Sequence, residues 1–154
     1  MFKSTPKQKS IRQGRSSENE LFYFFTAVTH NRTKIFLNKN AAEIVLNTLK
    51  WLDQKERINL IACVIMPDHL HFIAQLKETS IPKLMHSLKS YSANEINNAL
   101  ERKGHVWQSQ YYERGIRNEK SLMDLVKYCL ENPVRKGLAD DFKDYAFWYC
   151  KYEI

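Results

Sequence analysis

Hydrophobic and polar positions follow two periods along the chain, and each period predicts a different kind of element. The aromatic and β-branched run Leu21–Thr29 is apolar on both faces, which predicts a strand inside a sheet. Residues 40–55 repeat apolar side chains at helical spacing and predict an amphipathic helix. The short apolar run Leu60–Ile65 predicts a buried strand, ended by the turn signal at residues 66–68.

The next segment, His69–Leu76, alternates and predicts a second strand directly after the turn. We expect its even-numbered apolar residues to face the core and its two histidines to project from the opposite face. Residues 81–102 predict a second helix that Gly104 ends. Residues 106–117 have no clear period and predict an irregular segment with a strand near its end.

A third helix is predicted to begin after Asn118, a favourable N-cap, and to stop at Asn132, because Pro133 disfavours helix at the residue before it. Gly137 falls in a turn, and residues 145–149 predict an apolar cap or edge strand. The order of elements predicts an α+β fold: a ferredoxin-like antiparallel sheet with helices packed mainly on one face.

The length of 154 residues suits one domain, which we assign to residues 20–154. Residues 1–17 contain five Lys and Arg and no acidic side chain, so residues 1–19 predict a flexible basic arm. Such an arm is either a frayed terminus or a contact for a phosphate backbone.

The net charge is +7, from 24 Lys and Arg against 17 Asp and Glu, which favours an anionic partner such as nucleic acid. No apolar run approaches the ~18 residues of a membrane span, so no membrane partner is expected. The three cysteines are widely spaced and favour reduced thiols. These features predict a cytoplasmic protein.

His69 and His71 are the first candidates for a chemical role. Two residues apart on a strand, they project from one face and could share a metal ion. The pattern is short and common, however, and two histidines on a solvated strand face need have no function. The motif alone therefore favours the second interpretation.

Tyr128 and Asn132 lie four residues apart at the end of the predicted third helix and therefore share a face. An amide oxygen of Asn132 could bind a metal, and a tyrosine hydroxyl beside a metal-bound phosphate is a nucleophile for phosphoryl transfer. Lys127 and Arg135 are cations close to it in sequence. Taken alone, Tyr128 is better explained by packing at a helix edge.

Three motifs occur in one order along the chain. They are Met66-Pro67-Asp68-His69-Leu70-His71-Phe72, then Trp107-Gln108 followed by Tyr111-Tyr112, then Tyr128-Cys129-Leu130-Glu131-Asn132-Pro133-Val134. The first resembles the HUH motif, histidine–hydrophobic–histidine. The complete series resembles the HUH single-tyrosine transposases of insertion sequences, and among them the REP-associated tyrosine transposases.

The resemblance implies an enzyme that cuts and rejoins single-stranded DNA, often at hairpin-flanked ends, with Mg²⁺ or Mn²⁺ as its cofactor. It implies that Tyr128 attacks the scissile phosphate and leaves a 5′-phosphotyrosine. His69 and His71 would hold the metal with Asn132 as the third ligand, although some relatives have glutamine at that position. Relatives include monomers and homodimers, so a homodimer is one of two expected assemblies.

Further residues are candidates for binding DNA. Five cations could contact phosphates, namely Arg114, Arg117, Lys127, Arg135 and Lys136. Three aromatic residues could stack on unpaired bases, namely Trp107, Tyr111 and Tyr112. The alternative is that Trp107 belongs to the core and the tyrosines are half-buried. Tyr112 is also the second candidate for the nucleophile.

Two other functions remain open at this point. One is a domesticated module that binds single-stranded DNA or RNA without cutting it. The other is an HUH replication initiator or relaxase, although such enzymes are usually larger chains with additional domains. A complete set of His69, His71, Tyr128 and Asn132 favours the transposase, because a module that only binds has no need of it.

Overall fold

The computed structural model describes residues 21–153, and the basic arm predicted at residues 1–19 lies outside them. Its centre is one antiparallel sheet in the order β4-β1-β3-β2-β5. The strands are β1 (Phe22–Thr29), β2 (Ile58–Met66), β3 (His69–Leu76), β4 (Trp107–Ile116) and β5 (Trp148–Cys150). The α+β prediction is confirmed, and β1 lies inside the sheet as expected.

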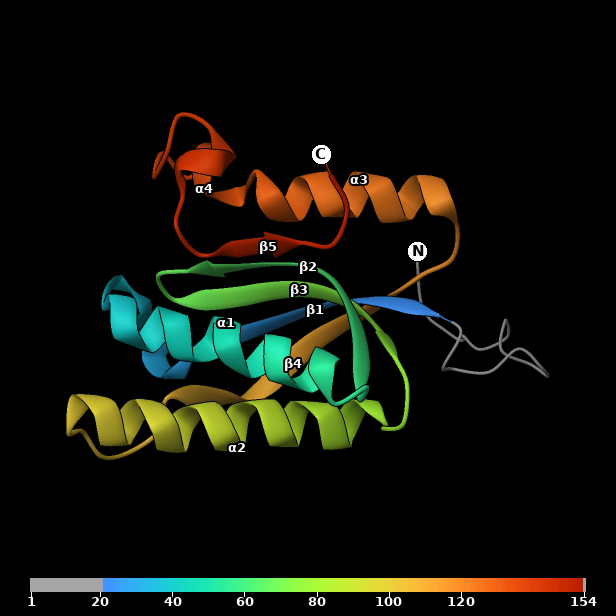
Figure 1. Cartoon of the computed structure of the whole chain (residues 1–154). Helices are drawn as coiled ribbons and strands as arrows, with labels where there is room; N and C mark the ends of the chain where they lie inside the picture. Colours follow the sequence, from blue (N-terminus) through green and yellow to red (C-terminus); the bar gives the residue numbers. More distant parts are fainter. Residues whose placement is uncertain (1–20, 154) are drawn as a thin grey trace.

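Helices lie on both sides of this sheet (Figure 1). The two long helices α1 (Lys39–Gln54) and α2 (Ile81–Leu100) pack against each other on one side, whereas α3 (Glu119–Leu130) lies on the other. A short helix, α4 (Asn132–Arg135), follows α3. Three 3₁₀ turns complete the fold, at His30–Arg32, Ile35–Leu37 and Phe142–Asp144.

The sheet carries a separate hydrophobic core on each face. On the α1 and α2 side, Phe25 stacks on Phe72 with the ring centroids 4.6 Å apart, and both side chains are fully buried. On the α3 side, Ile73 is fully buried and packs with Val126 and Cys129 of the helix. The histidine face of β3 is therefore covered by a helix and is not a solvated strand face.

Several element ends differ from the sequence predictions. The prediction of an irregular segment at residues 106–117 is wrong, because β4 is a continuous ten-residue strand with a bulge. At the bulge, residues 108–110 face Val28 alone, since Ala27 pairs with Tyr111 and Thr29 with Trp107. The second helix ends at Leu100, two residues early and before Gly104, because Glu101 adopts a left-handed conformation with φ 52°.

The third helix begins as predicted, with the Asn118 side chain accepting a hydrogen bond of 2.8 Å from the amide of Ser121. It ends at Leu130, and Asn132 opens the next helix instead of closing this one. Gly137, with φ 75°, occupies the turn beyond, as expected. The predicted terminal strand is shorter and lies at Trp148–Cys150, at the β2 edge of the sheet.

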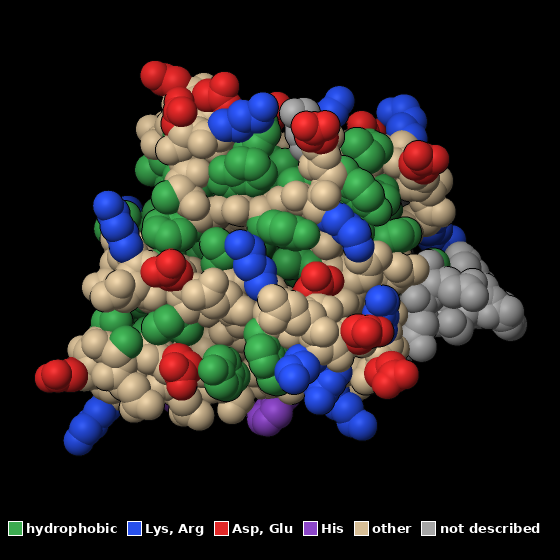
Figure 2. Space-filling model, in the orientation of Figure 1, with side chains coloured by type: hydrophobic (Ala, Val, Ile, Leu, Met, Phe, Trp, Pro, Cys, Tyr) green, Lys and Arg blue, Asp and Glu red, His purple; other side chains and the backbone are tan. Residues whose placement is uncertain are grey.

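Charge is distributed differently from what the net value suggests. On the face shown in Figure 2, Lys and Arg are interspersed with Asp and Glu, so the basic excess forms no continuous patch there. Within residues 21–153, no helix combines the length and the apolar character that crossing a membrane requires.

Candidate functional site

Strand register brings three polar side chains into one row on the α3 side of the sheet. Thr26 of β1 pairs with His71 of β3 on one side and with Tyr112 of β4 on the other. Residues directly opposite on antiparallel strands lie on the same face, so the row points toward α3. Thr26 thus connects the histidine motif to an exposed tyrosine from a distant part of the chain.

The two histidines are close to each other, and each is oriented by a hydrogen bond. Their ring centroids are 4.7 Å apart with the planes at 72°. Nδ1 of His69 donates to the Asp68 carboxylate at 2.7 Å, and Nδ1 of His71 shares a hydrogen bond of 2.9 Å with Thr26 Oγ1. With both Nδ1 atoms engaged, Nε2 is the ring nitrogen that each histidine can offer to a ligand. Metal-binding histidines are usually oriented in this way.

Burial and charge set the protonation of these groups. Burial, together with repulsion from His69 and Arg135, lowers the pKa of His71 to about 3, so its imidazole is neutral near pH 7. Burial alone would raise the pKa of Asp68, but its hydrogen bonds with His69 and Arg32 outweigh burial and lower it. Asp68 is therefore an ionised acceptor, and a neutral His71 is the form that coordinates metals.

Tyr128 lies in the last turn of α3 with 46% of its surface exposed. Its ring centroid is 6.1 Å from that of His71 and 6.1 Å from that of Phe24. The neighbouring Cys129 is buried, with its Sγ 3.8 Å from the main-chain oxygen of His71, which fixes the helix against β3. The helix thus holds Tyr128 at the rim of the histidine row with its ring accessible to solvent.

Arg135 of α4 lies over this tyrosine ring. Its Cζ lies 4.0 Å from the ring centroid, and its Nη2 donates to the main-chain oxygen of Tyr128. A guanidinium over an aromatic face is a cation–π contact, and the hydrogen bond keeps it in place. The break between α3 and α4 is what turns Arg135 back onto the tyrosine.

Asn132 is buried, with 3% of its surface exposed, and its Nδ2 has no hydrogen-bond partner. A buried polar group without a partner is rare in folded proteins and asks for an explanation. Because the nitrogen and oxygen of an amide are assigned from their surroundings, exchanging them would place a carbonyl oxygen at the unpartnered position. Asn132 therefore has the burial and the free amide that a ligand residue needs.

The donor set fits a divalent ion in its chemistry. Two imidazole nitrogens and an amide oxygen suit Mn²⁺ somewhat better than Mg²⁺, which prefers oxygen ligands. No cluster of three or more His, Cys, Asp and Glu side chains arranged to hold a metal occurs within residues 21–153. Any metal at this site would accordingly depend on the amide or on the substrate for its remaining ligands.

The candidate DNA-binding residues divide into those close to Tyr128 and those away from it. Arg114 and Tyr112, which is 61% exposed, line a cavity of about 610 Å³ that Tyr128 also borders. Lys127 and Lys136 are exposed close to Tyr128 in sequence. Arg117 lies at the opposite end of α3, eleven residues from Tyr128, which is about 16 Å along a helix.

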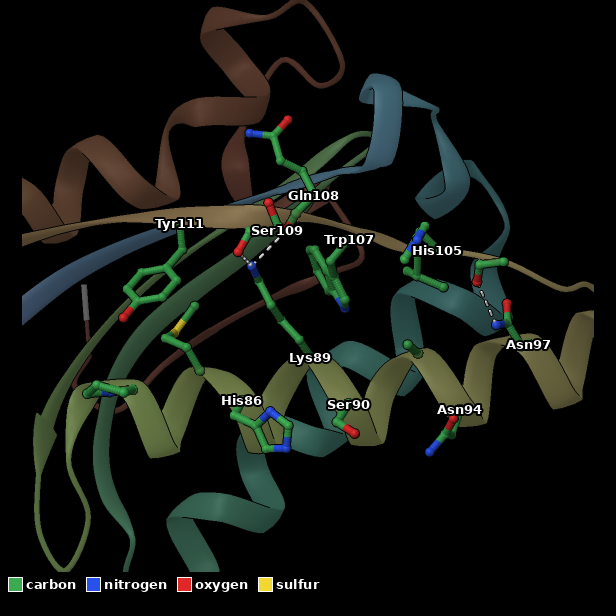
Figure 3. Close-up of a pocket in the computed structure, with 15 residues that line it drawn as sticks. His86, Lys89, Ser90, Asn94, Asn97, His105, Trp107, Gln108, Ser109 and Tyr111 are labelled. Atoms are coloured by element: carbon green, nitrogen blue, oxygen red, sulfur yellow. Dashed lines mark hydrogen bonds between the residues drawn. The ribbon is translucent and has the colours of Figure 1, made fainter.

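Trp107 and Tyr111 lie on the other face of the sheet, above α2 (Figure 3). Trp107 is buried, and its Nε1 donates to Ser92 Oγ at 3.0 Å, so it is a core residue and its stacking on bases is not supported. Tyr111 is half-buried beside Lys89, whose Nζ is 5.4 Å from the ring centroid. Of the three predicted stacking residues, only Tyr112 lies near Tyr128.

Sequence reasoning missed three residues that shape the site: Thr26, Phe24 and Asp124. Thr26 interrupts the apolar run of residues 22–28, and that exception was a usable signal. Phe24 carried none, since it belongs to an aromatic run, and its ring lies 6.1 Å from that of Tyr128 because α3 packs on this face of the sheet. Asp124 lies one helical turn before Tyr128 on α3, and that spacing could have been read from the sequence.

The chain is similar to known proteins over most of its length. A family model described as transposase IS200 like matches residues 17–132. A protein of Haemophilus influenzae with the provisional name REP-associated tyrosine transposase is 28% identical over 136 residues, which cover 81% of this chain and 77% of that protein. The REP-associated tyrosine transposase of Escherichia coli is 25% identical over 127 residues, covering 81% and 73%.

The fold is shared with solved structures. Among them is a REP-associated tyrosine transposase bound to a REP hairpin, with a TM-score of 0.68 and 24% identity. The match covers 83% of this chain and 75% of that one. The likeness thus includes most of the sheet and helices described above, and at this identity it concerns the fold alone.

Proposed function

Because the chain belongs to the IS200-like transposase family and resembles its REP-associated members, we propose that it cuts and rejoins single-stranded DNA through Tyr128. The observation that carries the proposal is the position of Tyr128. Its exposed ring lies 6.1 Å from His71, the buried member of an oriented histidine pair, and under the guanidinium of Arg135. Packing at a helix edge does not explain why these three features occur together.

The step we propose is an in-line displacement at phosphorus. The Tyr128 hydroxyl oxygen forms a bond to the scissile phosphorus, and the bond from phosphorus to the 3′-oxygen breaks. The hydroxyl proton leaves the tyrosine, and the departing 3′-oxygen takes up a proton to become a free hydroxyl. The products are a 5′-phosphotyrosine and a 3′-hydroxyl. Attack of a 3′-hydroxyl on the phosphotyrosine reverses the step and rejoins DNA, so no nucleotide cofactor is consumed.

Arg135 would serve this step through its charge. Negative charge accumulates on the phosphate oxygens and the tyrosine oxygen as the bonds change, and a positioned cation stabilises it. Stacking on the ring and donation to the Tyr128 carbonyl hold the guanidinium in place before DNA arrives. A preorganised cation of this kind avoids the cost of reorientation during the reaction.

His69, His71 and Asn132 would hold the divalent ion, which we propose to be Mn²⁺ or Mg²⁺. Such an ion supplies Lewis-acid polarisation of the scissile phosphate. The hydrogen bonds of Asp68 and Thr26 would keep both histidines oriented with Nε2 toward the ligand. The unpartnered buried amide of Asn132 supports its inclusion in this set.

The proposed substrate is single-stranded DNA that flanks a hairpin. The solved relative bound to a REP hairpin supports this choice, as do the exposed cations Arg114, Lys127 and Lys136. Contacts from these cations to phosphate would be independent of sequence and would weaken as salt rises.

The decisive experiment incubates the protein with single-stranded hairpin DNA and Mn²⁺ and separates the products under denaturing conditions. We expect a covalent protein–DNA adduct that is absent in Tyr128→Phe and retained in Tyr112→Phe. Peptide mapping of the adduct should locate the DNA on Tyr128. An adduct that persists in Tyr128→Phe would show that another residue is the nucleophile, and salt-sensitive binding without any adduct would favour a module that only binds.

A further inference from the structure

The cavity beside Tyr128 has the composition of a site for a single unpaired nucleobase. It measures about 610 Å³, within the range of ~300–1,000 Å³ that is usual for small-molecule pockets. Phe24 and Leu125 supply apolar wall, and Tyr112 adds an exposed aromatic ring. Asp124 adds a carboxylate, and Tyr128 closes one side. A flat aromatic ligand with polar edges matches this combination.

Two carboxylates line the cavity, Glu113 and Asp124, and Asp124 is the one that can discriminate between bases close to Tyr128. It precedes Tyr128 by four residues on α3, so the two side chains share a face one helical turn, about 5.4 Å, apart. The carboxylate forms one ion pair, with Lys120 at 3.2 Å, and both side chains are largely exposed. Exposed ion pairs contribute little to stability, so this one does not prevent Asp124 from binding a ligand.

Tyr112 is placed to provide the stacking surface. It pairs with Thr26 across the sheet, and Thr26 in turn bonds His71, so the ring belongs to the same row as the histidine pair. A base stacked on Tyr112 would thus lie in the cavity that borders the tyrosine proposed to attack DNA. An aromatic side chain stacks on any base, so the choice between bases depends on the Asp124 carboxylate.

We infer that this cavity binds the nucleobase next to the scissile phosphate, with Tyr112 as the stacking residue and Asp124 as a determinant of base specificity. The inference rests on the proposed function of Tyr128. A carboxylate accepts hydrogen bonds from the exocyclic amine of cytosine, adenine or guanine. Thymine has no such amine, and its single N3–H donor lies between two carbonyl oxygens that repel a carboxylate. The site therefore selects amine-bearing bases against thymine.

The test separates base preference from cutting by using Tyr128→Phe as the parent protein, without metal. Fluorescence anisotropy measures the affinity for single-stranded oligo(dC), oligo(dA) and oligo(dT) of one length. We expect oligo(dT) to bind about tenfold more weakly than oligo(dC), within the range for one discriminating contact. Adding Asp124→Asn should bring the ratio of the two dissociation constants close to one, since an amide can also donate to the thymine carbonyls.

Matched variants show whether Asp124 and Tyr112 cause the base preference and the affinity. Asp140→Asn removes the same charge from an exposed position outside the cavity and should strengthen binding to all oligonucleotides equally, leaving the ratio unchanged. Tyr112→Ala should weaken binding to the amine-bearing bases by about 5- to 150-fold, whereas Tyr112→Phe keeps the ring and the affinity. If Asp124→Asn and Asp140→Asn have the same effect on the ratio, the inference is wrong.

The adduct experiment with wild-type protein distinguishes a failure of the base site from a failure of the proposed cutting reaction. An adduct on Tyr128 together with an Asp124-independent base ratio overturns the base site and keeps the proposed function. An Asp124-dependent base ratio without any adduct keeps the base site as a binding site and overturns the cutting reaction, along with the placement of the base next to a scissile phosphate.

Discussion

The guanidinium of Arg135 lies over the ring of Tyr128, with Cζ 4.0 Å from the ring centroid, and also donates to the main-chain oxygen of that residue. Two contacts to the same partner hold the cation in one orientation. Because the planar guanidinium makes the stacking contact, an ammonium group cannot replace it while keeping the same geometry.

We therefore predict that Arg135→Lys slows adduct formation at saturating DNA by about 3- to 30-fold, the range that corresponds to ~0.5–2 kcal/mol of cation–π interaction. The measurement is the single-turnover rate of adduct formation. Lys136→Met is the control: it removes a neighbouring exposed cation and should change DNA affinity but not the saturated rate. Equal rates for Arg135→Lys and wild type would exclude a role for the stacked guanidinium in the reaction.

A second prediction concerns the hydrogen bond between Thr26 and His71. Thr26→Val keeps the shape of the side chain but removes the partner of Nδ1, which lies 2.9 Å away. Substitution of a residue that orients a metal ligand typically lowers metal affinity by about 10- to 100-fold. We expect the Mn²⁺ concentration for half-maximal adduct formation to rise by this factor, while DNA affinity without metal stays constant.

Thr26→Ser keeps the hydroxyl and is the matched control, for which we expect an Mn²⁺ requirement close to that of wild type. If Thr26→Val needs no more Mn²⁺ than Thr26→Ser, the orientation of His71 does not depend on this hydrogen bond.

Lys89 makes a prediction about stability. Its ammonium group donates to the main-chain oxygens of Gln108, Ser109 and Gln110 at 2.8, 3.3 and 3.0 Å, which holds the bulge of β4 against α2 (Figure 3). Lys89→Met keeps the length of the apolar stem and removes all three bonds. We expect a loss of about 1–3 kcal/mol in the free energy of unfolding, measured with urea.

Hydrogen exchange should show the loss of protection concentrated at residues 107–112. Lys83→Met, an exposed substitution on the same helix, is the control and should leave both measurements unchanged. Uniform loss of protection across the sheet in Lys89→Met would mean that the bulge is not a local unit.

The fourth prediction is a pH dependence. Burial raises the pKa of the Cys63 thiol from an ordinary value near 9 to about 12. Between these values the folded protein keeps a proton that the unfolded chain has lost, so the contribution of this thiol to stability is constant below pH 9 and falls as pH rises toward 12. The slope from this group is about 1.4 kcal/mol per pH unit.

Urea unfolding at pH 8 to 10.5 should therefore show a steep alkaline loss that Cys63→Ala reduces, although the cavity it leaves lowers stability at every pH. Cys150→Ala, at a half-buried thiol, should reduce the slope less. A slope that is unchanged in Cys63→Ala would show that the buried thiol does not contribute to the alkaline loss.

Local pattern predicted most of the elements, because β1, α1, β3 and the start of α3 are each determined by short-range features. It also predicted the histidine pair, since spacing on a strand decides that His69 and His71 share a face. What it could not decide was which face of the sheet α3 would cover. The apolar stripe of α3 fits either face, and only the packed structure shows that it lies on the histidine side.

The adjacent tyrosines 111 and 112 show the second limit. Neighbouring residues on a strand point to opposite faces, so only one of them can lie near Tyr128. Because residues 106–117 were predicted to be irregular, no face was assigned to either residue. The bulge at 108–110 is stabilised by Lys89 from a helix far away in sequence, and no local signal reveals such support. Asn132, predicted to close the third helix, instead opens α4, because Pro133 has no N–H to continue α3 and fits the first turn of a new helix.

The bulge has one more consequence, for the behaviour of the protein in solution. β4 is an edge strand, and an edge with free carbonyl groups invites a strand of another molecule to pair with it. Lys89 occupies three consecutive carbonyl oxygens at this edge, and the bulge interrupts the regular spacing that a new strand would need. A lysine that supports the local backbone thereby also protects the sheet against edge-to-edge aggregation.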